Sequence, residues 1–560
     1  MRRLAGSHTP EHKQEIYRLH KKKPFVQHNE QLFVQFVCIF QCFHLPLHPI
    51  LKKTTTKLEN QKAKMKKTLL MLTAALAVAY SALAGDYVTN TNHNAAFGRN
   101  PALDGKIDIN ALYSNPAGIG FLNKGWHLAF NVQSAYQHRD VSSTFGQNLT
   151  PYGLYAMGTV NGTPNGAGEK TFKGYAQAPV IPALDVAYVH DRWSAMFHFA
   201  FTGGGGKCDF DDGLGSFESL AAMLPIAINA GINDKLAAMG ATSPITAVDG
   251  YSMDMWMKGR QYYYGLQLQA GYKVLDNLNI SAGLRGVIAT AAYEGFVGNL
   301  KVHTAADLPA AVQTALGIPA DQYLPAATLL GEKGAMAADR EVDVTQSDFG
   351  LTPIISVDWR INDQWNVAAK YEFKTKLNLK NSVKDNKDGG LPSYADGVKH
   401  EADIPALLTI GAQYNPIKKL HLNVGGHLYF DKQAKQEDDR QELLDGPTWE
   451  ILAGIEWDIE DWVTVSAGWQ TTNYGLGENS KYISDMSFVT NSNTVGLGAR
   501  FNISKQVSLD VSYFKTLYKH YRVDYEDYNN LSKTFGTAIP GYNDFYRTND
   551  VFGVGVNVSF

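Results

Sequence analysis

The strongest constraint on the fold is a strict alternation of apolar and polar residues that recurs along the chain after residue 124. In RWSAMFHFAFT, every second residue from Trp193 to Phe201 is apolar, and Ser194, His198 and Thr202 alternate with them. A period of two is typical of a β-strand with one apolar and one polar face. About fourteen such segments occur, each close to the roughly ten residues that a tilted strand needs to cross a bilayer. They lie near residues 125, 181, 192, 260, 278, 349, 364, 404, 419, 448, 462, 494, 506 and 550.

The connections between these segments alternate in length. HDR, LDN, INDQ, NPIKK, IEDW and NISKQ are short, whereas 203–258 and 297–347 are long. This asymmetry is typical of an outer-membrane barrel, with the short turns periplasmic and the long loops extracellular. A large soluble β-sandwich or propeller would also alternate, but the chain has no blade-length repeat and such a fold needs no aromatic outward faces. We therefore predict an all-β fold, a transmembrane antiparallel β-barrel of about fourteen strands.

The start of the chain contains a complete export signal. Residues 65–84, MKKTLLMLTAALAVAYSALA, combine a basic start, an apolar centre and a small-residue cleavage site, which is the pattern of a signal peptide. A membrane anchor is the alternative interpretation of this segment, but its apolar centre is short for an anchor. We interpret residues 1–64 as an extension from a start codon assigned too early; a genuine N-terminal extension is the alternative.

Charge and cysteine usage exclude some classes of function. Residues 1–84 carry 14 Lys+Arg and 4 Asp+Glu, so the net charge of -3 leaves about -13 for residues 85–560. An acidic exported chain argues against a nucleic-acid partner. Only Cys208 lies beyond the leader, which excludes disulfides within the mature chain and a cysteine-based metal site. We expect no metal and no cofactor.

The stretch LYSNPAGIGFL precedes the first strand and contains the tight turn Asn115-Pro116-Ala117. Asn115 suits a helix cap and Pro116 the first helical position; an ordinary turn is the other reading. A short N-terminal plug, this triplet and a fourteen-strand barrel together resemble the FadL family of outer-membrane transporters for long-chain fatty acids and other hydrophobic compounds. The resemblance implies that residues 85–123 form a hatch in the lumen of a barrel at 124–560. It also implies ligand capture in an extracellular groove, binding inside the barrel, and an inward kink of the third strand that opens the wall sideways.

Three sequence features fit these implications, and each of them also has a purely structural interpretation. The third strand is interrupted at Gly203, Gly204, Gly205 and Gly206, and glycines mark bends in strands or simply lead into a loop. Apolar helical patterns near 207–258 and 303–340 fit a capture groove or local loop packing. Arg285 and Arg500 on the lumen face could hold a ligand carboxylate, or could belong to a solvated charge network with Asp358, Lys370, Glu372 and Asp510.

We therefore expect a monomeric transporter in the bacterial outer membrane, with passive uptake by loop capture, lumenal binding and lateral exit. Its partners would be a long-chain fatty acid or another hydrophobic small molecule and the outer-membrane lipid. A general diffusion porin and a loop-mediated adhesion protein are the alternatives. We do not expect an enzyme, because no nucleophile motif is visible.

Overall fold

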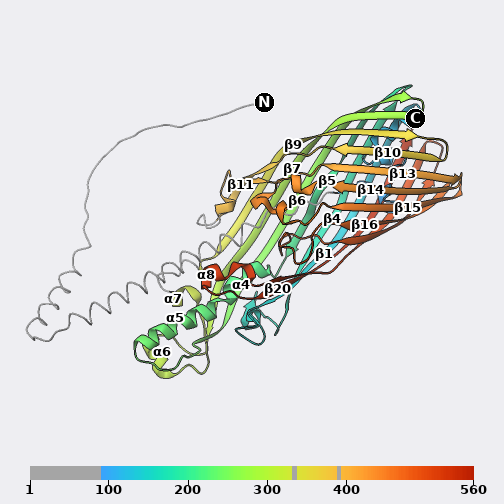
Figure 1. Cartoon of the computed structure of the whole chain (residues 1–560). Helices are drawn as coiled ribbons and strands as arrows, with labels where there is room; N and C mark the ends of the chain where they lie inside the picture. The colour runs from blue at the N-terminus through green and yellow to red at the C-terminus, as the bar shows by residue number, and fades with distance from the viewer. Residues whose placement is uncertain (1–89, 331–336, 387–391) are drawn as a thin grey trace, which may run out of the picture. The chain divides into compact units, whose positions relative to one another are not determined.

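The computed structural model describes residues 90–330, 337–386 and 392–560. Fourteen long antiparallel strands form a closed barrel, which confirms the fold predicted from the alternation (Figure 1). The first strand pairs with the last and with the next strand along the chain, so the sheet has no free edge at the seam. The barrel strands are β1 (Gly125–Phe145), β4 (Lys170–Val189), β5 (Trp193–Phe210), β6 (Val248–Leu275), β7 (Leu278–Thr304), β9 (Arg340–Arg360), β10 (Trp365–Glu372), β13 (Leu407–Ile417), β14 (Leu420–Tyr429), β15 (Trp449–Glu460), β16 (Val463–Asn473), β17 (Ser492–Asn502), β18 (Val507–Tyr518) and β20 (Gly541–Ser559).

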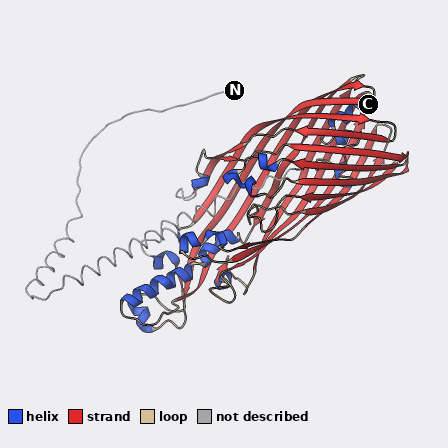
Figure 2. Cartoon of the chain, in the orientation of Figure 1, coloured by secondary structure: helices blue, strands red, loops and turns tan. Residues whose placement is uncertain are grey.

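Connection lengths divide the barrel into two different ends, as predicted. The turns after β4, β6, β9, β13, β15 and β17 are short and lie at the end that holds the C-terminus (Figure 1). The helices of the long loops gather at the opposite end (Figure 2). In outer-membrane barrels the short turns face the periplasm, and we use periplasmic and extracellular for the two ends on that basis.

The outer surface of the barrel is apolar and the inner surface is polar. Phe130, Leu268 and Val554 are about half exposed on the outside, whereas Asn131, Gln267 and Asp510 point inward and are buried. Tryptophans lie at the periplasmic strand ends, where Trp365 stacks on Tyr414 at 4.3 Å. A band of exposed apolar side chains flanked by aromatic residues is stable in a bilayer and costly in water.

Shorter strands extend the wall at the extracellular end. Pairing with β9 continues from β10 into β11 (Asn378–Asn386), and pairing with β20 continues from β18 into β19 (Tyr521–Tyr525). The remaining short strands are β2 (Gly158–Val160), β3 (Thr163–Pro164), β8 (Tyr323–Pro325) and β12 (Lys399–Glu401). These pieces belong to the loop layer and not to the fourteen-strand ring.

The long loops contain the helices α4 (Gly215–Ala222), α5 (Leu224–Ala238), α6 (Ala310–Leu316), α7 (Ala326–Leu330) and α8 (Ser532–Phe535). Among the described residues, Gly215–Ala238 is one helical stretch long and apolar enough to cross a membrane by length and composition. It lies between β5 and β6, and its apolar face is packed: Leu224, Ile228 and Ile232 are buried against the ends of β6 and β7 and the α6 and α7 region. These apolar side chains of α5 are therefore used for packing within the loop layer.

The extracellular end of the lumen is filled by a second apolar cluster. Inward side chains of β1, β4, β5 and β6 pack there on α4 and on the loops, with Phe145, Tyr155 and Tyr528 fully buried. Phe145 stacks on Tyr528 at 5.1 Å between ring centroids. These buried side chains therefore occupy space at the extracellular end of the lumen.

The predicted extension at 1–64 and the signal peptide at 65–84 lie outside the described residues. Both stay predictions. Of the segment 85–123, the structure describes residues 90 onward.

Candidate functional site

Residues 90–124, here called the N-terminal segment, lie inside the periplasmic half of the barrel. Its helix α3 (Ala95–Arg99) is capped by Asn94, whose side chain accepts a hydrogen bond from the Phe97 amide. The segment then passes so close to β13 that a Cβ on Gly105 would come within 2.5 Å of the Ala412 backbone. Only glycine fits such an approach, which means that the wall and the segment are shaped to each other.

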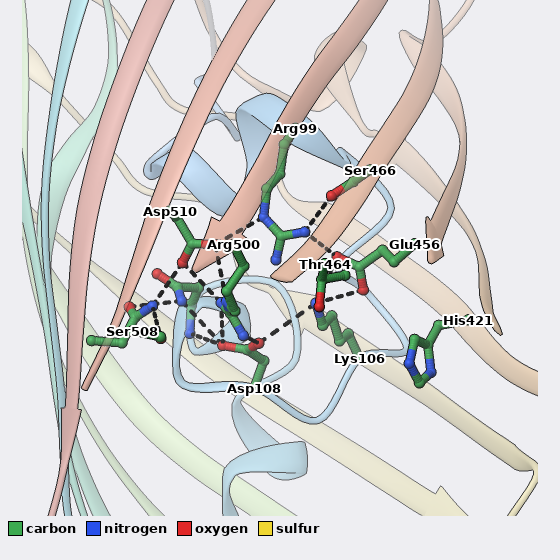
Figure 3. Close-up of polar contacts among 12 residues, drawn as sticks. Arg99, Lys106, Asp108, His421, Glu456, Thr464, Ser466, Arg500, Ser508 and Asp510 are labelled. Atoms are coloured by element: carbon green, nitrogen blue, oxygen red, sulfur yellow. Dashed lines mark hydrogen bonds and ion pairs between the residues drawn. The ribbon is translucent and has the colours of Figure 1, made fainter. Parts of the chain in front are cut away.

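Alternating charges join the segment to the wall in a buried network (Figure 3). Arg99 donates to Glu456 at 2.5 Å and to Asp510 at 2.9 Å. Lys106 Nζ lies 2.7 Å from Glu456 Oε2. Arg500 on β17 donates to Asp108 at 2.5 Å and to Asp510 at 2.9 Å. Three cations therefore meet three carboxylates, and the network has no net formal charge.

The same network controls the ionisation of Asp108. Burial alone would raise the pKa of this carboxyl, but the charges of Arg500 and Lys106 and the hydrogen bond from Arg500 lower its pKa well below the usual range. Asp108 therefore stays ionised, and removal of one partner would leave a buried charge uncompensated. Breaking one side of such a pair typically costs about 3–5 kcal/mol.

A second ion cluster lies across the lumen. Arg285 on β7 donates to both carboxylate oxygens of Glu372 at 2.6 and 3.1 Å, and Lys370 donates to the same carboxylate at 2.6 Å. Tyr113 of the N-terminal segment covers the two cations, with Lys370 Nζ 3.9 Å from its ring centroid. The two arginines considered as ligand contacts, Arg285 and Arg500, are thus both paired with carboxylates of the protein itself.

The Asn115-Pro116-Ala117 turn starts a short 3-10 helix, Pro116–Phe121. Asn115 accepts from the Gly118 amide at 3.1 Å and donates to Asp358 on β9 at 2.5 Å. The Ala117 amide donates to Ser356 on the same strand at 3.0 Å. The triplet is therefore a capped turn that docks on the wall.

The beginning of the described chain docks on β5. Asn90 donates through its amide side chain to Phe201 O at 3.0 Å and through its backbone to Thr202 O at 3.2 Å. His93 Nδ1 lies 2.9 Å from His198 Nε2, and His198 Nδ1 lies 2.7 Å from Asp185. The N-terminal segment thus donates hydrogen bonds to the part of β5 that does not pair with β4.

Strand β4, the neighbour of β5 in the barrel, separates from β5 in the middle of the wall. The strands pair from Gly174 to Gln177 and again from Leu184 to Val189, and none of the described pairs joins 178–183 to 200–206. We call this region the lateral gap. In the same stretch the pairing of β5 with β6 shifts between Phe201 and Gly206.

The four glycines predicted to break the third strand lie at the lateral gap. Gly204 and Gly206 have φ angles of +102° and +72°, which L side chains rarely adopt. A Cβ on Gly204 would also come within 2.3 Å of Gln261 O. The glycines therefore permit a bulge that a regular strand would not form.

Behind the lateral gap lies a cavity of about 350 Å³, here called the chamber. The gap contributes Ala178, Pro179, Val180, Gly203 and Gly204 to its lining, and the N-terminal segment contributes Asn90 and Phe97. Polar side chains of β16, β17, β18 and β20 line the far wall, including Gln470, Thr494, Thr516, Arg547 and Asn549. A cavity of this size is within the range of small-molecule sites, roughly 300–1,000 Å³.

Sequence reasoning missed three parts of this site. Pro179 and Pro182 lie in the part of β4 that does not pair with β5. Because proline donates no ladder hydrogen bond, the two prolines were a readable signal for a gap. Arg547 carried no signal, because its neighbours come from distant segments. The same holds for His93 and His198, which lie 105 positions apart.

Comparison with known proteins identifies the fold. The structure is similar to that of a Pseudomonas aeruginosa FadL homologue, with a TM-score of 0.53 and 16% sequence identity over 85% of this chain and 100% of that one. Weaker similarity links it to the toluene transporters TodX of Pseudomonas putida (TM-score 0.45, 13% identity, 80% and 94% covered) and TbuX of Ralstonia pickettii (0.42, 15%, 83% and 98%). No protein-family model and no curated protein sequence matches the chain.

Proposed function

We propose that the chain is a FadL-type transporter of the bacterial outer membrane, which takes up long-chain fatty acids or other hydrophobic compounds passively. The observation that carries the proposal is the chamber, which meets the membrane face of the wall at the lateral gap. Ligand captured by the extracellular loops would bind in the chamber and leave sideways through the gap. The N-terminal segment would act as the hatch that closes the straight route.

The energetics of a lipid tail favour this route. A tail that left through an aqueous periplasmic pore would meet water at about 0.8 kcal/mol per CH₂, on the order of 12 kcal/mol for sixteen carbons. A side opening delivers the same tail directly into lipid. Val180, 65% exposed, and the ring cluster of Phe201, Tyr262 and Tyr264 give the outer rim of the gap an apolar surface.

The occupied lumen argues against a general diffusion porin. A porin needs a continuous water-filled lumen, whereas the N-terminal segment and the apolar extracellular cluster occupy the two ends of this barrel. Adhesion by the loops would not require a chamber or a gap in the wall. We therefore favour transport over both alternatives.

The test replaces Gly203, Gly204, Gly205 and Gly206 together by valine or threonine, which favour a regular strand. We expect the variant to fold as a heat-resistant barrel that binds ligand but has at least about tenfold slower uptake of radiolabelled oleate into cells, since β-branched residues oppose the bulge. The matched control is Gly259→Thr on β6, where the nearest atom to a new Cβ lies 3.6 Å away.

Normal uptake in a folded variant whose third strand is shown to be continuous would remove the lateral gap from the mechanism. Loss of uptake in the Gly259→Thr control as well would mean that the assay reports barrel damage. An open-channel conductance of the size seen for porins in the unmodified protein would favour the diffusion porin instead.

A further inference from the structure

Arg547 on β20 is a buried cation in the lining of the chamber. Its side chain is 6% exposed, and its two terminal nitrogens donate to Phe488 O and Gln137 Oε1, each at 3.1 Å. Its guanidinium carbon lies 4.7 Å from the centroid of the Tyr518 ring. Within the described part of the chain, no carboxylate is within ion-pair distance of Arg547, and its Nε has no acceptor.

This environment differs from that of the three arginines in the two ion clusters. Arg99, Arg285 and Arg500 each donate to at least one buried carboxylate. A buried charge without an opposite charge is costly, because neutral dipoles replace its hydration only in part. Arg547 is therefore positioned where an anion from outside the protein would stabilise it.

A second arginine increases the positive potential at this point. Arg139 on β1 lies directly across from Arg547 in the register of the barrel seam. Arg139 donates to the same Gln137 oxygen, at 3.0 and 3.3 Å. Like charges directly opposite each other on paired strands destabilise the pair, and both guanidinium groups donate to Gln137 Oε1. An anion at this position would reduce that repulsion.

The chamber is polar around Arg547 and apolar toward the lateral gap. Gln470 Oε1 and Asn549 Oδ1, both from lining residues, are buried without a hydrogen-bond partner. Ala135, Ala178 and Phe201 line the side that leads to the gap. Among the described lining residues, Glu450 is the one carboxylate. It already accepts hydrogen bonds from His427, Tyr429, Gln470 and Thr472.

We propose that Arg547, supported by Arg139, binds the carboxylate of an amphipathic acid whose apolar tail points to the lateral gap. The inference rests on the proposed function and names the class of molecule that the chamber takes. Nε and the adjacent terminal nitrogen form a planar fork that matches the two oxygens of a carboxylate. The ligand would take over the hydrogen bond that Gln137 now accepts.

The test measures binding of two probes with the same tail, sodium laurate and 1-dodecanol, to the purified barrel in detergent. The variants are Arg547→Met, which keeps an apolar stem, and Arg547→Lys, which keeps the charge but loses the fork. Arg522→Met is the control, since Arg522 is half exposed on β19 and pairs with Asp524. Heat-modifiable migration in gels verifies that each variant is folded.

We expect laurate to bind the unmodified protein more tightly than dodecanol. Arg547→Met should weaken laurate binding roughly ten- to a hundredfold, because a charge-assisted fork is lost, and should change dodecanol binding less than about twofold. Arg547→Lys should lie between the two, and Arg522→Met should match the unmodified protein.

Unchanged laurate binding in folded Arg547→Met would overturn the carboxylate site and leave the proposed function standing. An equal loss of both probes would also overturn it, because Arg547 would then only maintain the shape of the chamber. If neither probe binds the unmodified protein, the proposed function itself fails.

Discussion

Individual residues show what local sequence patterns leave open. The alternation places Arg285 and Arg500 on the lumen face, and the structure places them there. Their partners could not be predicted, because Asp108 lies 392 positions from Arg500 and Glu372 lies 87 positions from Arg285. Both arginines are saturated by these carboxylates, so the ligand contact that we propose moves to Arg547, whose Gln137 partner is 410 positions away.

His93 is the residue through which pH should act on the N-terminal segment. Burial lowers the pKa of His93 well below its ordinary value of 6.5, and the nearby His198, Arg285 and Lys370 lower it further. When the segment is released, His93 returns to an ordinary pKa and takes up a proton below about pH 6.5. The released state then binds more protons than the docked state, so docking is stable above that pH and weakens as the pH falls.

We therefore predict that hydrogen exchange of the backbone amides around residues 93–97 speeds up between about pH 7 and about pH 5, after correction for intrinsic rates. Protonation makes His93 Nδ1 a donor at its 2.9 Å contact with His198 Nε2. His93→Gln should reduce this pH dependence. An identical pH profile in the folded variant would show that other groups control docking.

At the scale of elements, the sequence located the strands and a break in the third strand, but not the neighbour from which that strand separates. Alternation is a local property, and it located all fourteen barrel strands and the short turns. The separation of β4 from β5 depends on register between strands and on Asn90 of the N-terminal segment, which replaces β4 as the hydrogen-bond partner of β5. Gly203 to Gly206 indicated a bend, but not which neighbour the strand would leave.

The turn of the N-terminal segment gives a prediction at this scale. Changing Asn115 and Pro116 together to alanine removes the cap on Gly118 and the donor to Asp358. Loss of the cap costs about 1 kcal/mol. Asp358 keeps its hydrogen bond from Asn366, so loss of the second donor costs about 1 kcal/mol more. We expect an intact barrel with a less firmly docked segment and reduced uptake of hydrophobic substrate, measured as radiolabelled oleate accumulation.

The control for that variant changes Asn148 and Pro151 to alanine, an exposed asparagine and proline in the loop after β1. This control should take up oleate normally. If the Asn115 and Pro116 variant inserts correctly and also transports normally, the turn is only a structural connection.

For the whole molecule, the ion network at the periplasmic end decides which exit is less costly. Arg99, Lys106 and Asp108 tie the N-terminal segment to the wall through Glu456, Asp510 and Arg500 (Figure 3). A straight passage requires these pairs to separate, at several kcal/mol for each buried pair. A lateral passage leaves them in place, since the gap lies between β4 and β5.

The two routes predict different dependences of uptake on tail length. If the tail crosses water, each added CH₂ raises the barrier by about 0.8 kcal/mol. Four more carbons would then add about 3 kcal/mol and slow uptake on the order of 200-fold.

If the tail passes from the chamber directly into lipid, no such penalty arises. We then expect laurate and palmitate to be taken up at rates within about threefold of each other at equal occupancy of the chamber. The measurement compares initial uptake rates of the two radiolabelled acids at concentrations matched to their measured affinities. A strain that lacks the barrel serves as the blank. A steep fall from laurate to palmitate would contradict lateral exit, because only a route through water makes each added carbon count.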